Sequence, residues 1–226
     1  MSLRESKGNM YPWVTHTWNP ISGLCRHACL YCYMRRYPLR PVRLKAEDLR
    51  EDLGSGRVIF VGSGTDMFAF NIPNAWIKAV LLHCRFYPGN QYLFQSKNPW
   101  KFTFFNGLYP ANTIFGTTLE SDIGYQDLSQ APLPAARVEA MGSLKWLRRM
   151  VSIEPVLRFN PKKFINMIKA IKPEFVSIGA DSQGHKLPEP TPRELEALIG
   201  ALRGFTEIKL KKNLGRILGR EIKDRG

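Results

Sequence analysis

Residues 57–96, RVIFVGSGTDMFAFNIPNAWIKAVLLHCRFYPGNQYLFQS, decide the fold. The stretch begins and ends with short apolar runs, 57–62 and 91–96, which are typical of buried strands. Between the runs, apolar side chains recur at helical spacing and predict a helix that begins near Pro73: Trp76, Ile77, Val80, Leu81 and Cys84. A strand, a helix and a second strand in this order predict parallel strands joined by a helical crossover.

The same alternation continues along the chain. Further apolar runs predict strands at 113–119, 149–154, 175–180 and 207–211. We expect Asn160, followed by Pro161, to cap a helix, and TPRE at 191–194 to begin another helix with a capping box between Thr191 and Glu194. The apolar helical faces that should follow are Phe164, Ile165, Ile168 and Ile171, then Leu195, Leu198, Ile199 and Leu202. The sequence therefore predicts an α/β fold with a parallel sheet in one domain.

Composition limits the class of protein. At 44% apolar and 12% aromatic residues, the chain of 226 residues can bury a sizeable core. The longest aliphatic run is AVLL at 79–82, so no transmembrane helix is expected. The first residues lack the apolar core of a signal peptide, which predicts a cytoplasmic protein. Four cysteines are too few for a disulfide scaffold, so clustered thiols here suggest metal binding or catalysis.

The chain is strongly basic. Lysine and arginine number 33 against 19 acidic residues, a formal charge of +14. A solvated basic surface is one explanation, and a polyanionic partner is the other. Basic residues gather in two segments, which are Arg35, Arg36, Arg40, Arg43, Lys45 and Arg50, and then Lys209, Lys211, Lys212, Arg216, Arg220, Lys223 and Arg225.

The motif CRHACLYC at 25–32 gathers cysteines in the pattern C-x3-C-x2-C. A structural zinc site needs four ligands, and a redox C-x-x-C pair would leave Cys25 unexplained. Three thiolates, from Cys25, Cys29 and Cys32, can bind three irons of a 4Fe–4S cluster and leave the fourth iron open. We therefore predict a 4Fe–4S cluster, with zinc as the alternative, and we expect His27 to be an exposed loop histidine. Cys84 lies on an apolar helical face and should be an inert core thiol.

The spacing C-x3-C-x-aromatic-C resembles that of the radical S-adenosylmethionine (SAM) enzymes. This resemblance implies a partial (βα)6 TIM-like barrel, with a core of about 13–211 and a basic tail at 212–226 of one 1–226 domain. It also implies a 4Fe–4S cluster, SAM and an electron donor such as flavodoxin or ferredoxin. Tyr31 would pack near the adenine, and the loop VGSGTD at 61–66 would meet the methionine amine through Gly62, Ser63, Gly64 and Asp66.

Two groups of proteins within this superfamily are closer in detail. Five blocks, in order over about 13–185, resemble those of an uncharacterised phage and bacterial radical-SAM-like family. They are TWNPISGLC, VGSGTDMF, QSKNP, LESD and SIEPVL. The loop CRHACLYCY instead looks like that of spore photoproduct lyase-like proteins, which act on DNA thymine dimers.

Ionisable residues follow five predicted strands, at or just beyond the carboxyl end of each strand: Asp66, Lys97, Glu120, Glu154 and Asp181. In βα barrels this face holds the active site. We predict that Glu120 and Glu154 contact SAM or substrate, with Glu120 at the ribose hydroxyls. Weaker candidates are the polar lining residues Ser63, Thr118 and Ser152, together with His16 and, for substrate binding, His185. Trp18 could line the pocket or could equally belong to the core.

The substrate is the least determined prediction. The charge favours DNA or RNA, guided by Arg35, Arg36, Arg40 and Arg43. One alternative is a small-molecule enzyme of the deazapurine type. The other is a metal-bearing nucleic-acid-binding module without catalytic turnover.

Overall fold

The computed structural model describes residues 3–7, 10–38, 40–145 and 147–222. Lys223 and Arg225, two of the predicted basic residues, lie outside these ranges. The chain forms two compact units, which are described separately. Unit 1 comprises Met1–Ala28 and Met34–Phe115, and unit 2 comprises Cys29–Tyr33 and Gly116–Gly226.

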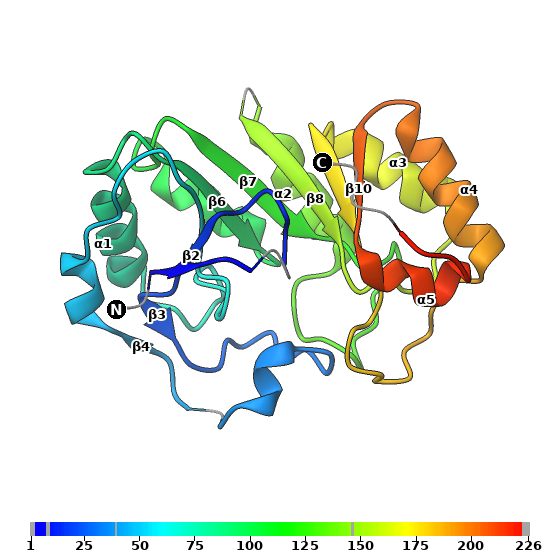
Figure 1. The fold of residues 1–226 in the computed structure, drawn as a ribbon, viewed down its shortest axis with the longest axis horizontal. Helices are drawn as coiled ribbons and strands as arrows, with labels where there is room; N and C mark the ends of the chain where they lie inside the picture. Colours follow the sequence, from blue (N-terminus) through cyan, green and yellow to red (C-terminus); the bar gives the residue numbers. More distant parts are fainter. Residues whose placement is uncertain (1–2, 8–9, 39, 146, 223–226) are drawn as a thin grey trace. The chain divides into compact units, whose positions relative to one another are not determined.

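Unit 1 contains the predicted βαβ stretch (Figure 1). Its strand order is β1-β2-β5-β6, followed by β7, whose last residues belong to unit 2. Strands β2 and β5 are parallel, as are β5 and β6, whereas β1 is antiparallel to β2 and β3 pairs with β4 in a separate ribbon. The strands are β1 (Arg4–Glu5), β2 (His16–Trp18), β3 (Ile21–Ser22), β4 (Arg43–Leu44), β5 (Val58–Val61), β6 (Gln91–Ser96) and β7 (Thr113–Thr118). The helices are η2 (Ala46–Arg50), α1 (Asn74–Arg85) and η3 (Pro99–Phe105), and η1 (Tyr33–Arg36) spans the junction of the two units.

The core of unit 1 contains the face of α1 that the sequence predicts. Ile77, Val80, Leu81 and Cys84 are each fully buried. Beside them, Phe68 packs edge-on against Phe102 with ring centroids 4.6 Å apart. Trp18 is also fully buried, so it is a core residue rather than a pocket residue.

Unit 2 repeats the strand-helix alternation. Strands β8 (Arg148–Ile153), β9 (Phe175–Ile178) and β10 (Glu207–Leu210) are parallel in that order. Helix α2 (Pro134–Ser143) packs against α3 (Pro161–Ile171), α3 against α4 (Pro192–Arg203), and α4 against β10 (Figure 1). After β10 come η4 (Lys212–Leu214) and α5 (Gly215–Leu218). The side chains of Leu214 and Leu218 are buried, so this segment packs against the rest of unit 2.

The structure confirms the α/β class, and the six predicted strands lie within two residues of their expected ends. Among the described residues β10 pairs with β9 and with no other strand, so the sheet does not close into a barrel. The capping box of Thr191 and Glu194 is present. Asn160 is the N-cap residue of α3 as predicted, but its side chain makes no capping hydrogen bond and donates to Asp122 Oδ2 at 2.9 Å instead. Within the described ranges, none of the helices has the length and apolarity needed to span a bilayer.

Candidate functional site

The motif cysteines are all thiols and belong to a connecting segment between β3 and η1. Cys25 lies in unit 1, whereas Cys29 and Cys32 lie in unit 2. Among the described residues, no three His, Cys, Asp or Glu side chains are grouped as metal ligands. The donor set nevertheless suits iron, because cysteine sulfurs are the usual protein ligands of iron–sulfur clusters. Cys84 differs, since burial raises the pKa of its thiol well above the ordinary value and keeps it protonated.

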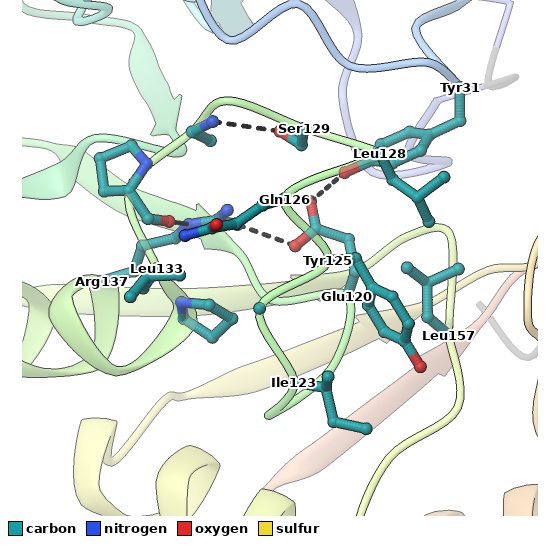
Figure 2. A pocket seen from close by; sticks show the side chains of 14 residues that line it. Tyr31, Glu120, Ile123, Tyr125, Gln126, Leu128, Ser129, Leu133, Arg137 and Leu157 are labelled. Carbon is teal, nitrogen blue, oxygen red and sulfur yellow. Dashed lines mark hydrogen bonds and ion pairs between the residues drawn. The ribbon is translucent and has the colours of Figure 1, made fainter.

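The segment Cys29–Tyr33 is held in unit 2 by contacts from three successive residues. The Cys29 sulfur lies 3.2 Å from Ser129 Oγ, and Leu30 N donates to Leu128 O at 2.8 Å. Tyr31 Oη then donates to Glu120 Oε1 at 2.6 Å (Figure 2). The loop that follows β7 therefore positions the second half of the cysteine motif.

Glu120 forms a buried ion pair that the sequence analysis did not predict. Arg137 Nη1 donates to Glu120 Oε2 at 2.8 Å, and both side chains are about 95% buried, with exposures of 4% and 6%. Arg137 also donates through Nε to Pro132 O at 2.6 Å (Figure 2). Its Nη1 donates to Thr118 O at 2.9 Å. Each oxygen of the Glu120 carboxylate thus accepts a hydrogen bond from unit 2 itself. The contact of Glu120 with the ribose of SAM remains a prediction. In the structure its carboxylate binds Tyr31 and Arg137, which is a structural role.

A small pocket lies beside this ion pair, and the loop after β7 supplies most of its wall (Figure 2). Tyr31, Glu120 and Arg137 line it together with Tyr125 and Leu157. Its cavity of about 20 Å³ holds little more than one water molecule. In this conformation the pocket is too small for SAM.

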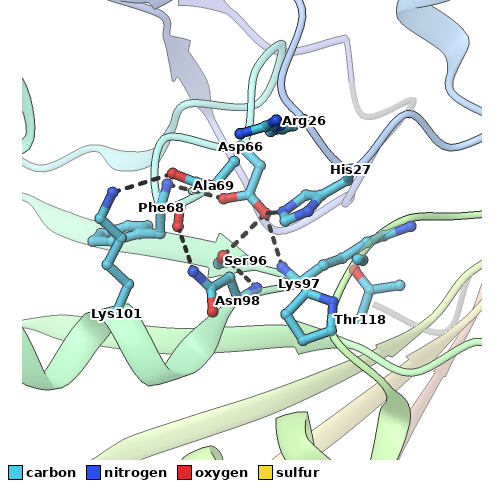
Figure 3. Close-up of polar contacts among 12 residues, drawn as sticks. Arg26, His27, Asp66, Phe68, Ala69, Ser96, Lys97, Asn98, Lys101 and Thr118 are labelled. Carbon is cyan, nitrogen blue, oxygen red and sulfur yellow. Dashed lines mark hydrogen bonds and ion pairs between the residues drawn. The ribbon is translucent and has the colours of Figure 1, made fainter. Parts of the chain in front are cut away.

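Asp66 is the centre of the polar network in unit 1 (Figure 3). Its Oδ2 accepts hydrogen bonds from Ser96 Oγ at 3.0 Å and Lys97 N at 2.8 Å, and it lies 2.8 Å from His27 Nε2. Its Oδ1 accepts from Phe68 N at 3.0 Å. Burial opposes ionisation, but the His27 imidazole and the hydrogen bonds of Lys97 and Ser96 outweigh it and lower the pKa of Asp66.

His27 was wrongly predicted as an exposed loop histidine. Its relative exposure is 2%, and the contact with Asp66 explains why the imidazole is buried. A polar ring can be buried at small cost when a charged partner accepts its hydrogen bond. The pair fixes the loop between Cys25 and Cys29 to the carboxyl ends of β5 and β6 in unit 1.

The rest of the loop VGSGTD is connected to the end of β2. Asn19 Oδ1 accepts from Gly64 N at 2.7 Å, and Asn19 Nδ2 donates to Ser63 Oγ at 3.0 Å. Gly62 has a φ of 76°, a left-handed conformation in which a β-carbon would be strained. The turn at 62–66 is therefore hydrogen-bonded to Asn19 at Ser63 and Gly64, and glycine at position 62 permits its left-handed backbone.

The remaining candidates at strand ends also have partners. In unit 2, Lys211 Nζ forms an ion pair with Glu154 Oε2. His185 Nδ1 lies 2.8 Å from Asp181 Oδ1. Burial alone would raise the pKa of Asp181, but hydrogen bonds from His185 and Gln183 outweigh burial and lower the pKa. In unit 1, the backbone N of Lys97 donates a hydrogen bond to Asp66 Oδ2 at 2.8 Å.

Two predicted lining residues are buried in unit 2. Ser152 lies within β8 opposite Ser177, and Thr118 ends β7. A role of Ser152 or Thr118 in lining a binding site remains a prediction.

The two basic segments differ in their surroundings. Arg35, Arg36 and Arg40 are exposed in unit 1, and Arg43 is exposed with Nε 3.4 Å from Ser22 Oγ. The basic residues near the C-terminal end of the described chain instead pair with acids of unit 2, as Lys209–Glu207, Lys211–Glu154, Arg216–Glu189 and Arg220–Glu196. These pairs neutralise part of the positive charge that the sequence assigns to the second segment.

Two residues of the site escaped sequence reasoning. Arg137 occurs on the buried face of α2 with Pro134, Ala140 and Met141, so helical spacing could have placed it on that face, although only the contact with Glu120 explains its burial. Ser129 lies in a loop and has no comparable signal. Its contact with Cys29 joins residues 100 positions apart, which only the fold brings together.

Comparisons with known proteins show what fold this is. No protein-family model matches the chain, and no curated protein matches it. Several solved structures do match. A cysteine-to-serine mutant of spore photoproduct lyase has a TM-score of 0.66 at 10% identity, covering 93% of this chain and 80% of that chain.

Two further matches are complexes of the same enzyme. Spore photoproduct lyase complexed with dinucleoside spore photoproduct has a TM-score of 0.66 at 10% identity, covering 92% of this chain and 79% of that chain. A mutant with bound AdoMet and dinucleoside spore photoproduct has a TM-score of 0.64 at 10% identity, covering 91% and 78%. At this identity the likeness is one of fold.

Proposed function

We propose that this protein is a radical SAM enzyme that acts on a nucleic acid or a nucleotide-like substrate. One observation supports the enzyme class most directly. The motif C-x3-C-x2-C, with Tyr31 before its last cysteine, occurs in a chain whose fold is that of spore photoproduct lyase, a radical SAM enzyme. Motif and fold are independent observations, because the two folds are alike although the two sequences are only 10% identical.

The residues that would bind the cluster are Cys25, Cys29 and Cys32. A cluster bound there would supply the single electron for reductive cleavage of SAM, and with it the radical chemistry that removes hydrogen from a substrate. The protein's part is to bind, orient and exclude water. Ser129, Leu128 and Glu120 hold the segment of Cys29 to Tyr31, and Asp66 holds the loop at His27.

We propose that SAM binds at the carboxyl ends of the parallel strands. In unit 1 the hydrogen-bonded turn of Gly62, Ser63 and Gly64 would offer backbone groups to the methionine part, and in unit 2 Tyr31 would offer an aromatic face to the adenine. Asp66 accepts several hydrogen bonds from unit 1, so we propose that it supports this turn more than it contacts SAM.

A nucleic-acid substrate is supported by the formal charge of +14 and by the exposed arginines after the cysteine motif. The solved complexes of the fold neighbour with dinucleoside spore photoproduct agree with this class of substrate. Cys84 does not qualify as a thiol hydrogen donor to a substrate, because it is fully buried. An electron donor of the flavodoxin or ferredoxin type completes the proposal.

Anaerobic reconstitution with iron and sulfide tests the enzyme class. We expect absorbance near about 400 nm, which Cys-ligated clusters show, and 5′-deoxyadenosine when SAM and a reductant are added. Cys29→Ala should lose the iron, and the matched control Cys84→Ala should keep it. A colourless, zinc-loaded protein without 5′-deoxyadenosine would instead support the non-catalytic metal module.

Binding as a function of salt tests the substrate class. The logarithm of the binding constant for DNA or RNA should fall linearly with the logarithm of salt concentration, by about 0.9 for each phosphate neutralised on duplex DNA. Replacing Arg35, Arg36 and Arg40 by Gln should make the slope shallower, whereas replacing the exposed Arg203 of α4 by Gln should not change it. Undetectable or salt-insensitive binding to both nucleic acids would favour the small-molecule enzyme.

A further inference from the structure

The contact between Cys29 and Ser129 in unit 2 places a hydroxyl beside a predicted cluster ligand, in addition to holding the cysteine segment in place. Ser129 Oγ lies 3.2 Å from Cys29 Sγ, within hydrogen-bonding range for sulfur. Cys29 is 8% exposed, so the contact lies mostly out of water. A hydrogen bond in such surroundings is electrostatically stronger than one in solvent.

The turn around Ser129 places its hydroxyl firmly. Ser129 N donates to Tyr125 O at 3.1 Å, and Ser129 Oγ accepts from Ala131 N at 3.2 Å. On the neighbouring residues, Leu30 N donates to Leu128 O at 2.8 Å. The backbone of the cysteine segment and the backbone of the turn are therefore fixed together immediately beside the contact.

Chemistry decides the direction of the bond. A serine hydroxyl has one hydrogen to donate and two lone pairs to accept with. Ala131 N already uses one lone pair of Ser129 Oγ, which orients the hydroxyl. A cysteine that ligates iron is a thiolate without a proton and can only accept, so Ser129 would have to be the donor.

We propose that Ser129 donates a hydrogen bond to the Cys29 thiolate in the iron-bound protein and thereby raises the reduction potential of the cluster. The inference rests on the proposed function. Reduction adds one electron, whose charge is shared by the sulfurs, so a donor at a sulfur stabilises the reduced state more than the oxidised state. Ser129 is a positioning and tuning residue, not a catalytic one.

A potentiometric titration of the reconstituted full-length protein, followed by electron paramagnetic resonance, tests the proposal. In Ser129→Ala the midpoint potential of the cluster should become more negative by up to about 59 mV. For one electron, this shift corresponds to a tenfold change in the ratio of reduced to oxidised protein at a fixed potential. Ser129→Thr retains the hydroxyl and should restore the midpoint of the parent protein. Ser143→Ala, which removes a hydroxyl on α2 that donates to Ala140 O, is the matched control and should leave the midpoint unchanged.

The outcomes separate this inference from the proposed function. If the parent and Ser129→Ala both bind iron and share one midpoint, the tuning role is wrong and the enzyme class stands. If Ser129→Thr is as negative as Ser129→Ala, the effect comes from the turn and not from the hydroxyl, which also overturns the inference. If the parent chain binds no cluster, both proposals fail together, and the missing absorbance of the parent shows this directly.

Discussion

Breaking the Glu120–Arg137 ion pair should destabilise the protein strongly. Both side chains are nearly fully buried and their atoms are 2.8 Å apart, so solvent cannot replace either partner. In Glu120→Gln the guanidinium remains buried without a counter-charge. Loss of one partner of a buried pair costs about 3–5 kcal/mol in the free energy of unfolding. At about 2–4 °C per kcal/mol for a chain of this size, the melting temperature should fall by roughly 6–20 °C.

Urea unfolding, monitored by circular dichroism, measures this loss in the protein without cofactors. The matched control is Glu174→Gln, which breaks an exposed pair with Arg148 in the same unit and should cost about 0–1 kcal/mol. The double variant Glu120→Gln with Arg137→Met removes both charges and should be more stable than Glu120→Gln alone. Equal stability of Glu120→Gln and the parent would refute the reasoning and leave Glu120 as a ligand-binding group only.

Three further predictions concern individual residues. His27→Ala should lower the free energy of unfolding by about 1.5–3 kcal/mol, because the charged Asp66 loses a buried hydrogen bond; an unchanged urea midpoint would contradict the buried pair. The pKa of Asp66 is lowered on folding, so the stability it contributes is complete above its ordinary value of 3.8 and disappears as the pH falls through the folded pKa. Acid titration of Asp66→Asn should therefore show a weaker loss of stability below pH 3.8 than the parent, and parallel curves would exclude this carboxylate. Thr191→Ala should cost about 1 kcal/mol through loss of the helix cap, while Thr191→Ser should cost little; equal losses would mean that the hydroxyl bond to Glu194 N is not the cause.

Local patterns in the sequence are enough to predict the framework of this protein. The strand and helix sequences differ in apolar period, and the period depends on backbone geometry that each segment adopts by itself. The bounds of β6 and most of the buried face of α1 follow from this reason alone, and of the predicted face of α1 only Trp76 is half-buried. The capping box at Thr191 is equally local, since its two hydrogen bonds join residues three positions apart.

The cysteine motif is also a local signal, and it indicates the chemistry without indicating the geometry. The spacing of Cys25, Cys29 and Cys32 predicts an iron–sulfur cluster or a zinc ion, because ligand number and softness are properties of the residues themselves. How the segment is held depends on residues far along the chain. Tyr31 meets Glu120 across 89 positions, and Cys29 meets Ser129 across 100.

Burial of polar groups was decided by the tertiary structure alone. His27 in a short polar loop has every sequence feature of an exposed residue, yet Asp66, 39 positions away, makes its burial favourable. Arg137 is buried for the same reason, because Glu120 offers a carboxylate 17 positions earlier. A polar side chain is buried only where a partner replaces its water, and that partner is brought near by the packing of the whole fold. The sequence therefore determined the six main strands and the helices α1, α3 and α4, and it predicts which cysteines would bind iron, whereas the tertiary structure decided which polar side chains meet.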